Sequence, residues 1–229
     1  KINGNYYTFV DGKMQTGWFK LPAAENAATA SEAVKADASS ISGYQYYDED
    51  GKRASGWRTI EGAEGISEEA EVYKFYFKNG VPHHAQSGLE LFSIDSKKYA
   101  FNTKGEMQTG KQSVNIGDSA SANFYFGEDG AMKTGKQTIY DEDWANPELD
   151  FHTDGSRKGQ GYHGIKDNVL YIYGLRQEAD KDLRYVPVEL NGNQYLVNAN
   201  GVVQKASSSS KSSAREAFPG EGGAETPHM

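Results

Sequence analysis

The sequence predicts an all-β protein, a solenoid of stacked β-hairpin repeats. Two features of its composition favour this fold: aromatic residues make up 12% of the 229 residues, and glycine occurs 26 times. Flat rings separated by turn-forming residues are typical of short strands rather than helices. The third observation is a hexapeptide of the form Gly-x-Met-x-Thr-Gly, which occurs at residues 12–17, 105–110 and 130–135. Such self-similarity indicates a repeat architecture.

The spacing of the turn glycines sets the length of the repeat. Gly80, Gly105, Gly130 and Gly155 follow one another at intervals of 25 residues. The steps from residue 12 to 51 and from 51 to 80 are longer, 39 and 29 residues. The central repeats therefore define the period, and the N-terminal repeats carry insertions.

Each of the first five turn glycines lies just after an aromatic cluster, and most of them directly follow Asp or Asn. The clusters are Tyr6–Phe9, Tyr44–Tyr47, Phe75–Phe77, Tyr99–Phe101 and Phe124–Phe126. Asp-Gly or Asn-Gly between alternating aromatics is a strong hairpin signal, because these residues tolerate the positive φ of a tight turn. Every repeat is thus predicted as strand, turn and strand, with a second glycine (17, 56, 110 or 135) closing the return strand. Because an isolated hairpin is marginally stable, we expect consecutive hairpins to stack and bury their aromatic faces.

The predicted solenoid covers residues 1–205, with an insertion at 21–40 and degenerate repeats over 149–205. The insertion is rich in alanine and lacks an apolar stripe, which favours a surface loop over a docked helix. Within the degenerate part, Val169–Tyr173 is expected to form a continuous buried strand. Residues 206–229 are rich in Ser, Gly and Glu and are predicted to be disordered, because this composition buries too little surface to order itself. Since the chain opens at Lys1 directly in patterned sequence, we interpret it as a mature protein or a trimmed fragment.

Charge and residue usage argue against several classes of function. A net charge of −8 disfavours nucleic acid and anionic membranes as partners, and no apolar run is long enough to cross a bilayer. The absence of cysteine removes disulfides, cysteine-based zinc sites and cysteine nucleophiles. Motifs for serine hydrolases, phosphate-binding loops and zinc proteases are also missing. We therefore expect a non-enzymatic protein with no cofactor, no metal and no membrane insertion.

Three clusters look like metal sites but are interpreted otherwise. His83 and His84 are adjacent, and neighbouring residues of an extended strand point to opposite faces, so we expect loop histidines that do not chelate together. The acidic runs Asp48–Asp50 and Asp141–Asp143 lack the spacing of an EF-hand loop. They are expected to be acidic turns that keep the protein soluble.

Taken together, the aromatic cluster, the turn glycine and the Gly-x-Met-x-Thr-Gly motif resemble the cell-wall-binding, choline-binding-type repeats of Gram-positive surface proteins. They are also similar to the related glucan-binding repeats and to the receptor-binding repeats of large clostridial toxins. The resemblance covers about residues 1–205. It implies a β-hairpin solenoid, secreted or cell-wall-associated, that binds choline or carbohydrate between hairpins and performs no catalysis.

The resemblance also implies where the ligand binds. In the choline-binding family, the cage combines the Trp after the closing glycine with the first aromatic of the next cluster. The matching residues here are Trp18, Trp57, Tyr6 and Tyr44, and we expect Trp18, Tyr44 and Trp57 to line one N-terminal cleft. In later repeats the Trp position holds Leu89, Lys111 or Lys136, and the opening position holds Lys74, Lys98 or Asn123. Choline is therefore expected at the N-terminal cleft only, and glycan binding stays open elsewhere, since aromatic faces stack on sugars as well as on cations.

The function predicted from the sequence is a secreted, non-catalytic module that recognises cell-wall polymer or another glycan through aromatic clefts. Several weak clefts on one scaffold would gain affinity for a repeating polymer through multivalency. Two alternatives stay open. The chain could be a spacer or adhesin stalk with a protein partner, or the targeting part of a larger wall hydrolase.

Overall fold

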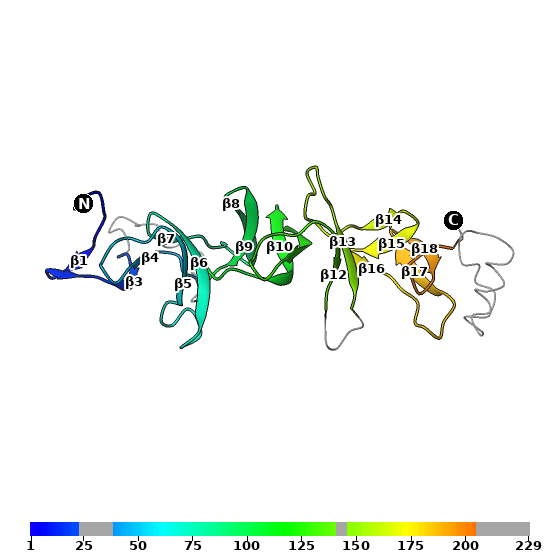
Figure 1. Cartoon of the computed structure of the whole chain (residues 1–229), viewed down its shortest axis with the longest axis horizontal. Helices are drawn as coiled ribbons and strands as arrows, with labels where there is room; N and C mark the ends of the chain where they lie inside the picture. Colours follow the sequence, from blue (N-terminus) through cyan, green and yellow to red (C-terminus); the bar gives the residue numbers. More distant parts are fainter. Residues whose placement is uncertain (23–38, 141–145, 205–229) are drawn as a thin grey trace. The chain divides into compact units, whose positions relative to one another are not determined.

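The computed structural model describes residues 1–22, 39–140 and 146–204. Residues 23–38 of the predicted insertion, the acidic run Asp141–Asp143 and the predicted tail 206–229 lie outside the described residues. The chain divides into two compact units. Figure 1 labels their strands. The first unit comprises Lys1–Ser121 and Phe126–Met132, and the second comprises Ala122–Tyr125 and the chain from Lys133 onward.

The first unit is built from antiparallel strands. Its strands are β1 (Phe9–Val10), β2 (Lys13–Met14), β3 (Gly17–Lys20), β4 (Tyr44–Tyr47), β5 (Gly56–Glu61), β6 (Val72–Lys78), β7 (Val81–Pro82), β8 (Leu89–Ile94), β9 (Lys97–Asn102) and β10 (Gly110–Gly117). They form small sheets in the order β1-β2, β3-β4, β5-β6-β7 and β8-β9, while β10 pairs with β11 (Ala120–Phe126). The boundary between the two units falls within β11.

The second unit holds a larger sheet and a separate hairpin. Its strands are β12 (Gly135–Thr138), β13 (Glu148–Phe151), β14 (Gly164–Lys166), β15 (Val169–Ile172), β16 (Leu175–Arg176), β17 (Val186–Leu190) and β18 (Asn193–Val197). The five-stranded sheet has the order β12-β13-β16-β15-β14, and β17 pairs with β18. The buried strand predicted at Val169–Tyr173 forms as β15, but it ends at Ile172 because Tyr173 is an exposed turn residue.

Consecutive repeats of the first unit are joined by regular hydrogen bonds. The amide of Met107 donates to the carbonyl of Lys74 (3.0 Å), and the amide of Met132 donates to that of Lys98 (2.9 Å). Since 25 residues separate both Met107 from Met132 and Gly105 from Gly130, this contact recurs with the sequence period. The prediction of an all-β fold of hairpin repeats is confirmed: the described residues contain strands and no helix.

Side-chain contacts explain why methionine and glycine recur together in the motif. The side chain of Met107 lies directly over Gly130, the turn glycine of the next repeat, where even a Cβ atom would overlap it. Met14 lies over Gly51 in the same way. The turn glycine is thus required for close approach as well as for its positive φ.

The phase of the hairpins differs from the prediction. The second glycine of each motif does not close the return strand; Gly17, Gly56, Gly110 and Gly135 instead begin the strands β3, β5, β10 and β12. Strands β3 and β5 pair with the aromatic strand that follows, as in Gly17–Lys20 with Tyr44–Tyr47. After Gly105, the described residues form no return strand of any length, only a single β-bridge between Phe101 and Met107. The long hairpins are therefore formed across the motif boundary.

The turns are of two kinds, and the return strand is short after both. Asp11-Gly12 and Asn79-Gly80 are tight turns with positive φ at both residues, as predicted. At Gly51 only the glycine has positive φ, and its amide donates to the carbonyl of Asp48 (2.9 Å). The Asp48 carboxylate also accepts from the amides of Asp50 (2.9 Å) and Lys52 (2.8 Å). The return is equally short after the tight turns, as Lys13–Met14 and Val81–Pro82 show. The long strands begin only at the second glycine, and Gly17 and Gly56 have positive φ there.

Buried rings form the core of the first unit. Strand β6 alternates, with Phe75 and Phe77 fully buried and Lys74 and Lys78 exposed. Phe101 and Phe126 are buried in the equivalent clusters. The aromatic clusters therefore act mainly as core, and a ligand can reach only the rings on the partly exposed face of each hairpin.

Candidate functional site

The register of β5 with β6 gathers polar and aromatic groups on one face of this hairpin. Trp57 lies opposite Tyr76, and Thr59 lies opposite Lys74. Because alternate residues of a strand share a face, these four side chains project to the same side. Phe75, opposite Arg58, projects to the other side and is fully buried there.

Trp57 packs into an aromatic cluster formed with the following repeat. Its ring lies edge-on to Tyr76 (5.2 Å between ring centroids) and to Tyr99 (4.9 Å), and stacks at 6.0 Å on Phe101. Such pairs each contribute about 0.5–1.5 kcal/mol beyond their buried area. The indole is half-buried, so it is held firmly while part of it remains accessible.

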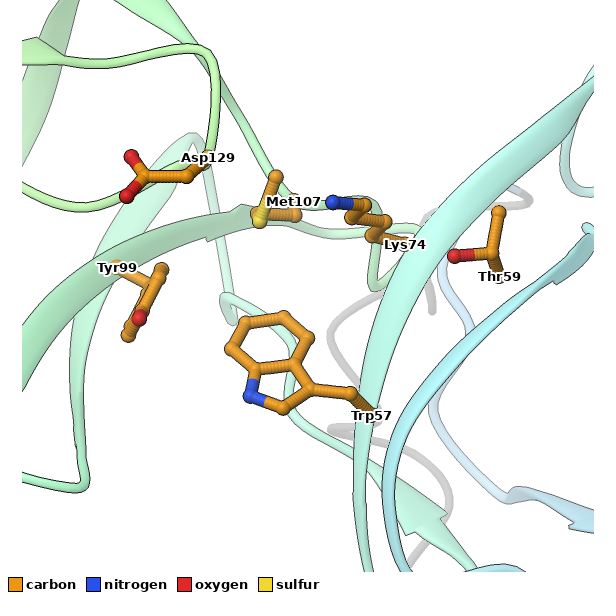
Figure 2. Close-up of a pocket in the computed structure, with 6 residues that line it drawn as sticks. All are labelled: Trp57, Thr59, Lys74, Tyr99, Met107 and Asp129. Carbon is orange, nitrogen blue, oxygen red and sulfur yellow. The ribbon is translucent and has the colours of Figure 1, made fainter.

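An open pocket of about 300 Å³ lies against this cluster, within the first unit. It is lined by Trp57, Thr59, Lys74, Tyr99, Met107 and Asp129. Figure 2 shows Tyr99 and Asp129 toward one side of the pocket and Lys74 and Thr59 toward the other, with the Trp57 indole and the Met107 thioether between them. The pocket therefore offers two aromatic rings, a hydroxyl, an ammonium and a carboxylate within one small volume.

The contacts between repeats position the walls of this pocket. Lys74 is fixed through its carbonyl, which accepts from the amide of Met107. The Met107 side chain rests on Gly130, and the neighbouring Asp129 is oriented by the amide of Ala131, which donates to its Oδ1 atom (3.0 Å). Three successive repeats thus contribute to the site, and a change in their stacking would deform it.

The structure places the four residues predicted from the sequence in different surroundings. Trp57 lines the pocket. Trp18 lies on the preceding hairpin, where its ring packs against Tyr46 (5.2 Å), Phe75 (5.1 Å) and Phe77 (5.6 Å). Its indole nitrogen donates to the carbonyl of Glu61 (2.9 Å). Trp18 is therefore engaged by the protein itself.

The two tyrosines face cations of the same chain. Tyr44 shares a hairpin face with Trp18, and the ammonium of Lys20 lies 5.7 Å from its ring centroid. Tyr6 is 44% exposed, but the guanidinium of Arg53 lies only 3.9 Å from its ring centroid. Trp18, Tyr44 and Trp57 do not meet in one aromatic cluster, because Trp57 belongs to the next hairpin.

Sequence reasoning missed five pocket residues: Thr59, Lys74, Tyr99, Met107 and Asp129. The hairpin shift explains the omission, because it brings Tyr99 rather than Tyr44 against Trp57. The spacing of the repeats could have indicated some of these residues. Met107 and Asp129 belong to the two repeats that follow Lys74, and stacking in register places such residues side by side.

The clusters that resembled metal sites have ordinary structural roles where the structure describes them. His83 stacks on Phe92 (4.6 Å) and Tyr76 (5.1 Å), and burial, with a smaller contribution from Lys78, lowers its pKa. Asp48 caps a turn, as described above. Across the described ranges, no group of three or more His, Asp or Glu side chains could hold a metal ion. The same ranges contain no helix suited to crossing a membrane.

Comparison with solved structures finds, among others, choline-binding proteins, a modular cell-wall endolysin and a truncated alternansucrase from Leuconostoc mesenteroides. One is choline-binding protein F from Streptococcus pneumoniae, crystallised with a peptidoglycan analogue. The two chains are 17% identical, the match covers 90% of this chain and 51% of that chain, and the TM-score is 0.41. A second crystal form of that protein gives 18% identity, 90% and 72% coverage and a TM-score of 0.47. The pneumococcal cell-wall endolysin from phage Cp-1, complexed with choline, gives 18% identity, 72% and 35% coverage and a TM-score of 0.35.

This chain spans about half the length of the first of these structures. No protein-family model matches it, and no match was found among curated protein sequences.

Proposed function

We propose that this chain is a non-catalytic, secreted or cell-wall-associated module that binds cell-wall polymer or another glycan in the pocket at Trp57. The observation that carries the proposal is the composition of the pocket walls. Trp57 and Tyr99 supply ring surfaces on which the apolar face of a sugar can stack. Thr59, Lys74 and Asp129 supply the polar groups that a sugar's hydroxyls require.

The same walls favour glycan over choline. A quaternary ammonium is held by aromatic faces that surround its charge. Here an ammonium of the protein, Lys74, occupies the wall next to Trp57 and repels a second cation. Lys74 and Asp129 together suit a ligand that carries hydroxyls and charges, such as a peptidoglycan fragment with its peptide.

The N-terminal rings give little room for choline either. Arg53 covers Tyr6 and Lys20 lies over Tyr44, so each ring already has a cationic partner. The rings of Tyr6 and Tyr44 therefore favour choline no more than the pocket at Trp57 does. The stalk with a protein partner is the second candidate, favoured by these occupied rings and by Lys111 and Lys136 at the later Trp positions.

A pull-down with purified Gram-positive cell walls, together with a glycan array, tests the proposal. We expect the chain to bind walls, and Trp57→Ala to weaken binding by about tenfold or more, the effect of removing a contact worth about 1.4 kcal/mol. Lys74→Glu should also weaken it and, being an exposed position, should leave the fold intact by circular dichroism.

Tyr6→Ala is the matched control, since it removes an exposed ring away from the pocket and should leave wall binding unchanged. No binding of the wild-type chain to walls or to any glycan would overturn the proposal and favour the stalk. A binding chain that tolerates both pocket substitutions would refute the site.

A further inference from the structure

An aromatic residue occupies an unfavourable turn position in the second unit. Tyr173 follows β15 and, with Gly174, forms the two-residue turn into β16; the φ angles are 46° and 99°. Turns of this kind select Asn, Asp or Gly, and a bulky residue at positive φ is an outlier. Tyr173 is also 62% exposed, so its ring contributes little to the core. Folding alone does not explain a tyrosine here.

The surrounding structure holds Tyr173 in place despite this strain. The Asn123 side-chain amide donates to the Tyr173 carbonyl (3.2 Å), and the Gly174 amide donates to the carbonyl of Tyr162 (2.7 Å). Gly161 lies so close that a Cβ atom there would overlap the Tyr173 carbonyl. Strained residues fixed by their surroundings in this way concentrate at ligand sites.

A histidine fixes the orientation of the ring. His163 stacks on Tyr173 with ring centroids 4.2 Å apart and ring planes 23° from parallel. Its Nδ1 atom accepts a hydrogen bond from the Tyr173 amide (3.2 Å). In the neutral ring the proton is then on Nε2, which lies 3.2 Å from Asn191 Oδ1 and donates to it. With one face covered by the imidazole, the opposite face of Tyr173 is the exposed one.

We infer that Tyr173, backed by His163 and flanked by Asn191, is a second carbohydrate-binding platform that takes the apolar face of a neutral pyranose ring. The ring is flat, exposed and rigidly oriented, which keeps the entropic cost of binding low. Asn191 accepts from His163 through its oxygen, so its Nδ2 donors remain for a sugar hydroxyl beside the platform. The site shares no residue with the Trp57 pocket; it rests on the proposed function only for the choice of glycan as the ligand class.

NMR titration of the full chain with the β-1,4-linked tetrasaccharide of N-acetylglucosamine, and separately of glucose, tests the inference. We expect the ring resonances of Tyr173 and His163 to shift saturably with at least one of them. Tyr173→Asn should weaken binding at this site by about tenfold or more, as read from the His163 resonances. It should also keep or raise the melting temperature, because Asn suits the turn.

Two controls separate the platform from other exposed rings and from the first pocket. Tyr140 of the same unit is 83% exposed, and Tyr140→Asn should leave the titration at Tyr173 unchanged. Trp57→Ala should also leave it unchanged.

The outcomes distinguish this inference from the proposed function. A shift of the Trp57 indole resonance without one at Tyr173 overturns the platform and leaves the first pocket standing. The reverse result supports the platform and counts against the Trp57 pocket. A clear fall in melting temperature for Tyr173→Asn would show that the tyrosine is structural, and the inference would fail.

Discussion

The two units are stabilised by different chemistry. In the first unit, buried aromatic rings recur with the repeat, and neighbouring rings contact each other from one hairpin to the next, as Trp18 does with Phe75 and Trp57 with Phe101. In the second unit, an aliphatic and tyrosine cluster takes over: Leu170, Leu190, Tyr195 and Val197. In the first unit, the periodic sequence repeats the same kind of ring contact from hairpin to hairpin. In the second unit, the sequence is degenerate, and the core is formed by contacts that do not repeat.

A buried ion pair is the clearest of these individual contacts. Asp150 is 0% exposed, and its Oδ2 atom accepts from the ammonium of Lys166 at 2.9 Å. Among the described residues, its Oδ1 atom has no hydrogen-bond partner. The hydrogen bond to Asp150 raises the pKa of Lys166. Both residues of this pair belong to the second unit.

Removing a core ring should have the largest effect on stability. Phe75→Ala is expected to lower the free energy of unfolding by about 3–5 kcal/mol, because it leaves a cavity beside Trp18 and Phe77. Leu170→Ala in the second unit should cost about 2–5 kcal/mol. Urea denaturation followed by circular dichroism measures both. Equal tolerance of Phe75→Ala and of Tyr6→Ala, an exposed position, would show that the rings are not the core of the first unit.

Breaking the ion pair should have a comparable or slightly smaller effect. Lys166→Met leaves the Asp150 carboxylate buried without its cation, which costs about 3–5 kcal/mol for a fully buried pair and less here, since the Lys166 side chain is 38% exposed. The double variant Asp150→Leu with Lys166→Met should recover much of the loss. A single variant as stable as the wild type in chemical denaturation would contradict this view of the second unit.

Two turn glycines allow the cost of backbone strain to be measured separately from the cost of a side-chain clash. Gly130→Val is expected to lower stability by about 1–3 kcal/mol, because φ is +81° and Met107 must move. Gly155→Val, at φ +70° with no atom within 4 Å of a new Cβ, experiences backbone strain alone. Thermal unfolding should therefore show a larger shift for Gly130→Val than for Gly155→Val. The reverse order would mean that the contact with Met107 is unimportant.

A small pH effect is expected in the first unit. Burial lowers the pKa values of His83 and His84 below their ordinary 6.5, although Glu90 partly opposes this at His84. The unfolded chain then binds protons more readily, so stability falls as the pH drops through 6.5. The melting temperature should decrease from about pH 7 to about pH 5. His83→Phe should reduce that slope, and an unchanged slope would exclude His83 as its source.

The hexapeptide and the Asp-Gly and Asn-Gly dipeptides were sufficient to predict hairpin repeats, because Asp11-Gly12 and Asn79-Gly80 form tight turns. It could not predict which strands pair at length, because the return strands are short after tight and wide turns alike and the long hairpins begin at the second glycine. Trp57, predicted from the sequence as a ligand contact, lines the pocket together with Tyr99, which the sequence did not indicate; its contact with a ligand stays a prediction. The turn at Tyr173 was not predicted, because tight turns favour Asn or Gly and the sequence therefore placed this tyrosine at the end of a strand.

The central claim, that the pocket at Trp57 takes glycan in preference to choline, is tested most directly by isothermal titration calorimetry. The full chain is titrated with a soluble tetrasaccharide-pentapeptide fragment of peptidoglycan, with and without excess choline. We predict saturable binding of the fragment that choline does not compete and that Trp57→Ala weakens. Binding of choline in preference to the fragment, or fragment binding that is unchanged in Trp57→Ala, would contradict the claim.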